Sequence, residues 1–104
     1  MSNKNILINE TFIVDHSVKD LWVSEFKAIY IKELKKSGLV SDIIFSKVVS
    51  DYNPDGISYA LQYKTDQKNI EVIQADKILS SNRNHLDNKY KNQFASFVTF
   101  LEII

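Results

Sequence analysis

Three side chains in the sequence are candidates for lining a ligand site: Glu10, Tyr59 and Tyr63. Glu10 lies in a predicted strand, and a regular strand would place it on the same face as Ile8 and Phe12, within an apolar layer. A carboxyl group buried there would have a raised pKa and could act as a general acid or base. Alternatively, a bulge, or a contact with Lys47 or water at the sheet rim, would leave Glu10 without a catalytic role.

The two tyrosines flank Leu61 on one side of a predicted strand. Such a pair could line a slot for a ligand, although aromatic side chains more often pack in the core with their hydroxyl groups at its edge. The two histidines, His16 and His85, have no further metal ligand at helical spacing. We therefore expect exposed histidines, no catalytic residue, no metal site and no cofactor.

Composition excludes several other chemistries. The chain has no cysteine, which rules out a thiol nucleophile, a disulfide and a zinc–thiolate site. Two glycines are too few for a glycine-rich phosphate loop. Thirteen basic and thirteen acidic side chains give a net charge of zero, which argues against a general nucleic-acid binder.

Length and hydropathy indicate one small cytoplasmic domain. The 104 residues lie near the most frequent domain size, so we predict a single domain over 1–104 with residues 1–5 loose. No apolar run approaches the ~20 residues needed to cross a bilayer, and the N-terminus lacks a signal-peptide pattern. We therefore expect no membrane association.

The elements that must position the candidate side chains alternate between strand and helix. A β-branched and aromatic run predicts a strand over 6–14. The next segment predicts a helix that Ser17 caps and Gly38 ends in the left-handed conformation. Its apolar stripe consists of Val18, Leu21, Trp22, Phe26, Ile29 and Leu34.

The second half repeats the pattern with an added hairpin. A strand over 39–52 leads into Asn53-Pro54-Asp55-Gly56, where the glycine suits a positive φ that closes the loop. The remaining segments are expected to form a strand over 57–65, a helix capped by Asp66 over 66–79, a polar connection over 80–92 and a strand over 94–104. Residues 85–87 could form one helical turn within the polar connection.

The order β-α-β-β-α-β predicts an α+β, ferredoxin-like fold, with a four-stranded antiparallel sheet and two helices on one face. The other face would then show a surplus of apolar residues, including Leu7 and Ile13. We favour a homodimer that packs sheet against sheet to cover this surplus. The alternative is that these residues pack under the connection over 80–92.

Four features carry a resemblance to a known family: Trp22, Gly38, the segment 59–63 (Tyr-Ala-Leu-Gln-Tyr) and the segment 94–99 (Phe-Ala-Ser-Phe-Val-Thr). They resemble a small bacterial family of uncharacterised domains of about 100 residues. Val98 stands where that family tends to have arginine, and Tyr30 where it often has histidine. The resemblance implies a dimeric α+β barrel, similar in fold to antibiotic-biosynthesis monooxygenases, without implying a reaction.

These observations favour a homodimeric module that binds a small hydrophobic ligand or another protein. The alternative is a cofactor-independent oxygenase or isomerase that holds a small aromatic substrate between sheet and helices, with Glu10, Tyr59 and Tyr63 as its polar groups. A third option is a structural or regulatory partner of another protein. A closed pocket of ~300 Å³ or more with converging polar groups would indicate an enzyme. A filled core with an open patch on the surface would instead indicate an interaction module.

Overall fold

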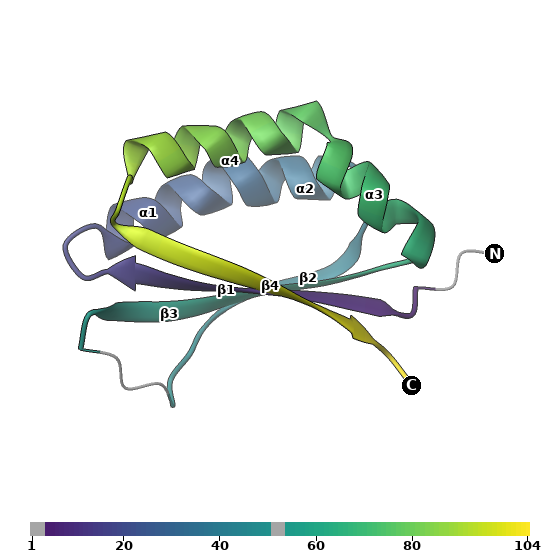
Figure 1. Cartoon of the computed structure of the whole chain (residues 1–104), viewed down its shortest axis with the longest axis horizontal. Helices are drawn as coiled ribbons and strands as arrows, with labels where there is room; N and C mark the ends of the chain where they lie inside the picture. The colour runs from purple at the N-terminus through teal and green to yellow at the C-terminus, as the bar shows by residue number, and fades with distance from the viewer. Residues whose placement is uncertain (1–3, 51–53) are drawn as a thin grey trace.

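The computed structural model describes residues 4–50 and 54–104 and shows one antiparallel sheet (Figure 1). Its strands lie side by side in the order β2-β3-β1-β4, the order of a ferredoxin-like fold. The predicted α+β class, the four strands and their antiparallel pairing are confirmed. The strands are β1 (Ile6–Asp15), β2 (Ser41–Lys47), β3 (Gly56–Thr65) and β4 (Phe94–Glu102).

All helices lie on one face of this sheet, as predicted (Figure 1). We call that face the inner face and the opposite one the outer face. The first helical segments follow one another without a gap: α1 (Lys19–Glu25), the π-helix η1 (Phe26–Ile31) and α2 (Lys32–Lys36). The others are α3 (Gln67–Ala75) and α4 (Lys77–Lys89).

The strand register confirms the predicted alternation. Phe12 lies opposite Tyr59, Glu10 opposite Leu61, and Ile8 opposite Tyr63, and directly opposed residues share a face. All of these except Glu10 belong to the buried core. Glu10 is therefore carried into the apolar layer by the regular strand, as its position in the sequence predicts.

The π-helix sets which side of the first helix is buried. Trp22, Phe26, Tyr30 and Leu34 recur every fourth residue and are at most 7% exposed. A π turn has i→i+5 hydrogen bonds and thus more residues per turn than an α-helix, so it keeps a four-residue spacing on one face. The predicted stripe is wrong at Leu21, which is 55% exposed. It lies about 100° around the helix from Trp22, away from the sheet.

The predicted cap at Ser17 is also wrong. α1 begins after Val18, and no side chain caps its first turn. Ser17 instead forms hydrogen bonds to the last residue of β1: its backbone N–H and its hydroxyl both donate to Oδ1 of Asp15, at 2.9 and 2.8 Å. These hydrogen bonds lower the pKa of Asp15. An Asx turn therefore replaces the cap, because the aspartate two residues earlier can accept from the same serine.

The second strand is shorter than predicted. β2 ends at Lys47, and Val49 is 90% exposed rather than part of a strand face. The register shifts between Ser41 and Ile44, where Asp42 has a φ of 55°. The end of the predicted strand and the start of the predicted turn, Tyr52 and Asn53, lie outside the described residues.

The two glycines serve different purposes. Gly38 ends the first helix with a φ of 68°, as predicted. Gly56 does not have the positive φ expected for it. A Cβ atom at Gly56 would lie 2.4 Å from the carbonyl oxygen of Val14, so this glycine permits a close approach of β1 and β3.

The polar connection predicted over 80–92 is wrong, because most of it is helix α4. The chain becomes extended at Asp76, with φ −66° and ψ 119°, which ends α3 four residues before the predicted Leu79. The Asp76 carboxylate accepts from the backbone N–H groups of Ile78 and Leu79 and so starts α4. Asp66 caps α3 as predicted.

The outer face carries apolar residues around a polar centre. Gln62 donates to Asn9 there, with 3.0 Å between Nε2 and Oδ1. Large apolar side chains lie towards its margins, with Ile44 55%, Phe97 60% and Leu101 42% exposed. The alternative in which the surplus packs under residues 80–92 is wrong, because α4 covers the inner face (Figure 1).

Candidate functional site

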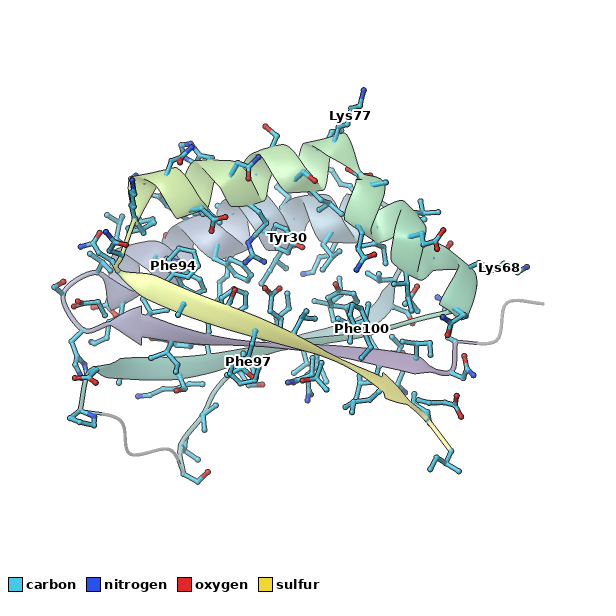
Figure 2. The ribbon with its side chains drawn as sticks, viewed as in Figure 1. Tyr30, Lys68, Lys77, Phe94, Phe97 and Phe100 are labelled. Atoms are coloured by element: carbon cyan, nitrogen blue, oxygen red, sulfur yellow. The ribbon has the colours of Figure 1, made fainter. Side chains whose placement is uncertain are left out.

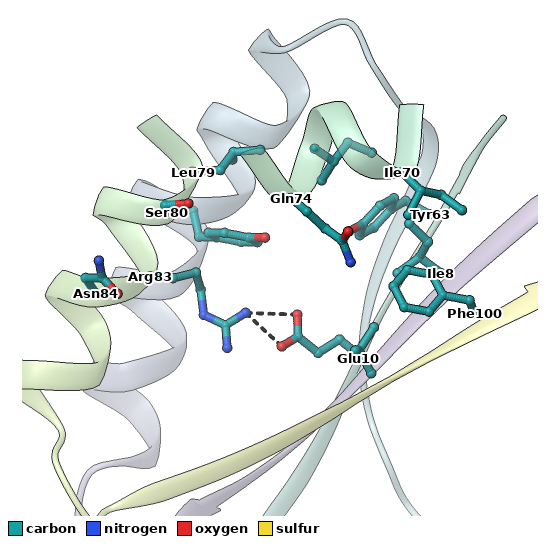
Figure 3. A pocket seen from close by; sticks show the side chains of 13 residues that line it. Ile8, Glu10, Tyr63, Ile70, Gln74, Leu79, Ser80, Arg83, Asn84 and Phe100 are labelled. Carbon is teal, nitrogen blue, oxygen red and sulfur yellow. Dashed lines mark hydrogen bonds and ion pairs between the residues drawn. The ribbon is translucent and has the colours of Figure 1, made fainter. Parts of the chain in front are cut away.

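A cavity of about 270 Å³ lies between the inner face of the sheet and the helices (Figure 3). We call it the edge cavity, because β4, the edge strand, supplies one of its walls. Aliphatic and aromatic groups make up most of its surface, and amide, hydroxyl and charged groups converge on it. Its lining residues are Ile8, Glu10, Tyr30, Tyr63, Ile70, Ile73, Gln74, Leu79, Ser80, Arg83, Asn84, Val98 and Phe100.

An ion pair between Glu10 of β1 and Arg83 of α4 lies at one wall of the edge cavity (Figure 3). One guanidinium nitrogen, Nη1 of Arg83, donates to both carboxylate oxygens of Glu10, at 2.9 and 2.7 Å. The other terminal nitrogen, Nη2, donates to the hydroxyl of Ser96 on β4 at 3.2 Å. The Glu10 side chain is 12% exposed and that of Arg83 20%. The pair therefore joins helix to sheet in a largely desolvated place.

The Arg83 guanidinium lies near two aromatic rings. Its central carbon lies 5.2 Å from the ring centre of Phe12 and 5.3 Å from that of Tyr30, within cation–π range. Burial opposes the charge on Arg83, but the adjacent Glu10 carboxylate raises the pKa of Arg83 on balance. The buried Nε–H group of Arg83 has no hydrogen-bond partner among the described residues. Arg83 thus remains a cation, and its Nε–H donor is unused among the described residues.

The two tyrosines of the edge cavity are hydrogen-bond donors at neutral pH. Burial raises the pKa of Tyr63 well above its usual value, and neighbouring Tyr30 and Glu10 raise it further. Burial, followed by the charge of Glu10, also raises the pKa of Tyr30, which lies between the helices and the sheet (Figure 2). Neither phenol would act as a general base, because neither ionises near neutrality.

The structure brings together two of the three candidate residues. Glu10 and Tyr63 both line the edge cavity, whereas Tyr59 packs against Trp22 and Phe45 in the aromatic core, with ring centres 6.0 and 5.8 Å apart. Four residues along a strand span about 13 Å, so two tyrosines on one face reach different parts of the core.

Arg83 is the residue that the sequence analysis missed. It stands in the segment predicted to be a polar connection with room for no more than one helical turn. The spacing of the buried residues Leu79, Leu86 and Tyr90 at i, i+7 and i+11 is helical and could have revealed α4. Arg83, at i+4, lies on that same buried side.

Two further findings concern metals and membranes. Within 4–50 and 54–104, no group of three or more histidine, aspartate or glutamate side chains is arranged to hold a metal ion. The helices in this part of the chain are too short or too polar to cross a bilayer.

The fold is that of the antibiotic biosynthesis monooxygenases. A putative member from Caulobacter crescentus superimposes with a TM-score of 0.71 at 7% identity, covering 99% of this chain and 93% of that one. A protein from Pseudomonas aeruginosa gives 0.74 at 8% identity, covering 100% and 98%. SnoaB, a cofactor-independent oxygenase from Streptomyces nogalater, gives 0.64 at 11% identity, covering 93% and 91%.

The chain belongs to the DUF4286 family, a domain of unknown function, whose model matches residues 5–104. This membership confirms the resemblance to a family of uncharacterised domains of about this length. No curated protein matches the chain in sequence. Tyr30 and Val98, where the resemblance led us to expect a histidine and an arginine, both line the edge cavity.

Proposed function

We propose that the protein binds a small, neutral, mostly apolar molecule in the edge cavity, through one hydroxyl or carbonyl group, and does so as a homodimer. The observation that carries this proposal is the ion pair of Glu10 and Arg83 at the wall of an otherwise largely apolar cavity. Since a cavity of about 150 Å³ can hold benzene, the 270 Å³ found here suits a molecule of one or two rings.

The ion pair favours a neutral ligand over an anion. Glu10 already neutralises Arg83, so a carboxylate entering the edge cavity would compete with Glu10 and lie beside its charge. A hydroxyl group can donate to the Glu10 carboxylate, and a hydroxyl or carbonyl oxygen can accept from Arg83 or from the Tyr63 hydroxyl. One such group on a ring would therefore use polar atoms that the cavity presents.

The proposed homodimer rests on the exposure of β4. This edge strand is regular over nine residues, lacks lysine, arginine and proline, and carries exposed Phe97 and Leu101 on the outer face. An exposed edge strand of this kind tends to associate with another chain unless a helix, a loop or a second subunit covers it. By contrast, the register shift near Asp42 interrupts β2 at the other edge. A second copy packed on the outer face would cover Phe97 and Leu101.

We expect light scattering at micromolar concentration to return the mass of two chains. Phe97→Glu should convert the protein to a single chain, because it places a charge in the proposed contact. Val72→Glu is the matched control, since Val72 is 49% exposed on α3, among the helices. A single-chain mass for the unmodified protein, or an intact dimer of Phe97→Glu, would contradict the homodimer.

The second candidate function is a cofactor-independent oxygenase or isomerase. It is favoured by the fold shared with SnoaB and by the position of the edge cavity between sheet and helices. Two observations make the enzyme a weaker candidate than the ligand-binding module. Both oxygens of Glu10 already accept from Arg83, so Glu10 would have to give up one of these hydrogen bonds to contact a substrate proton, and the raised pKa of Tyr63 leaves that phenol protonated. A cytoplasmic location stays a prediction from the sequence.

The probe for the edge cavity is 2-naphthol, which joins two rings to one hydroxyl group. Calorimetric titration should show one site per chain, and Ser80→Trp should weaken binding at least tenfold by filling the cavity from α4. Ser81→Trp, one residue along the same helix and outside the lining, should bind like the unmodified protein.

The anion 2-naphthoate tests the preference for a neutral ligand. Its binding to the edge cavity, measured as the part that Ser80→Trp removes, should be at least tenfold weaker than that of 2-naphthol. Equal binding of both probes, or binding of 2-naphthol that survives Ser80→Trp, would contradict the proposal.

A further inference from the structure

A second hollow, of about 400 Å³, lies at the opposite edge of the sheet from β4. It is formed between the first helix, through η1 and α2, and the edge strand β2, and we call it the lysine groove. It shares no lining residue with the edge cavity. Its lining residues are Lys27, Ile31, Lys32, Lys35, Ile43 and Phe45.

The floor of the lysine groove is apolar. Ile31 is 7% exposed, and Ile43 and Phe45 pack partly buried against the core. The Phe45 ring lies 5.1 Å from that of Phe26, between ring centres, so the floor is backed by rigid aromatic packing. A short hydrocarbon chain laid on this floor would cover apolar surface that now faces water.

The rim is positively charged. Lys27, Lys32 and Lys35 are exposed on the groove side of the helix, and none forms an ion pair among the described residues. The three acidic residues on the same helix pair with other lysines: Asp20 with Lys19 and Glu33 with Lys36, both at 3.8 Å, and Glu25 with Lys89. In a chain of zero net charge, three unpaired cations therefore gather around one apolar hollow.

We propose that the lysine groove binds a small amphipathic carboxylate, with the anionic head among the three ammonium groups and a short aliphatic chain on the floor. The positively charged rim favours an anionic head group, and the apolar floor favours a hydrocarbon tail. A membrane surface fits less well, because a flat lipid layer would meet the lysine tips without reaching Ile31, which is nearly buried. This inference is independent of the function proposed for the edge cavity.

Octanoate is the probe, followed by amide chemical shifts of isotope-labelled protein. We expect saturable shifts at Ile31 and Ile43 and none that saturate at Arg83. The triple variant Lys27→Gln, Lys32→Gln, Lys35→Gln should bind at least tenfold more weakly. The matched control replaces three other exposed lysines that form no ion pair with the described residues, Lys68, Lys77 and Lys91, and should change affinity less than twofold.

The tail is tested separately with Ile43→Ser, which should weaken octanoate binding at least threefold. Its control is Ile44→Ser, whose side chain lies on the outer face of the same strand. Thermal unfolding confirms that each variant is folded. The proposal is overturned by equal binding of both triple variants, by octanoate shifts centred on Arg83, or by no shifts at millimolar octanoate. Co-sedimentation with anionic phosphatidylglycerol vesicles that the groove triple abolishes would also overturn it in favour of a lipid surface.

Discussion

Replacing Arg83 with methionine is expected to lower the free energy of unfolding by about 3 kcal/mol, because it leaves a largely buried carboxylate without its partner. The Glu10 side chain is 12% exposed, and the described contacts of its carboxylate are those with Arg83. Methionine keeps much of the apolar stem that packs near Phe12 and Tyr30. The loss therefore reports the charge rather than the volume, and urea unfolding near neutral pH measures it.

The double variant Glu10→Gln, Arg83→Met should recover most of this loss, since it removes both charges together. Asn84→Met is a suitable control, because Asn84 is exposed on the same helix and lines the same cavity. Losses that simply add in the double variant would show that the two side chains contribute independently, against the geometry described here.

A methyl group at Gly56 is expected to cost about 3 kcal/mol, at the upper end for overpacking, because its neighbours are backbone atoms. The Cβ atom of Gly56→Ala would lie 2.4 Å from the carbonyl oxygen and 2.9 Å from the carbonyl carbon of Val14. The strands β1 and β3 must separate at this end to accept it, which disturbs the pairing of Asp15 with Gly56. Urea unfolding measures this loss as well.

Comparison with Gly38→Ala separates the steric cost of an added methyl group from the cost of its effect on the backbone conformation. Nothing lies within 4 Å of a Cβ atom at Gly38, so this variant carries only the cost of a positive φ, about 1 kcal/mol. If Gly56→Ala were no more destabilising than Gly38→Ala, the close approach of β1 and β3 would not be the reason for Gly56.

Most of the fold could be predicted because its signals are local. A β-branched and aromatic run identifies β1, alternation identifies β3, and the stripe that contains Trp22, Phe26 and Leu34 identifies the first helix. The π turn inside that helix could not be predicted, since an i+4 spacing is equally compatible with an α-helix. α4 was missed because its exposed side is rich in serine and asparagine, which resembles a loop in composition.

The site was harder to predict because its two charged residues are 73 positions apart in sequence. Alternation alone places Glu10 on the inner face, but nothing local to β1 indicates that its partner is Arg83 rather than Lys47 or water. Once α4 is recognised as a helix that Asp76 caps, the spacing from Leu79 places Arg83 over the sheet. The ion pair was therefore not predicted because a single helix, α4, was not recognised in the sequence.

Arg83 offers a direct test of the proposed ligand site, because it is the single arginine of the chain and its Nε–H group gives one separate nitrogen–proton resonance. That group is buried and has no partner among the described residues. Titration with 2-naphthol should move this resonance in a saturable way, with the affinity found by calorimetry, and Ser80→Trp should abolish the movement. A resonance that stays in place while 2-naphthol saturates the protein would contradict the account, since the ligand would then be bound away from the ion pair.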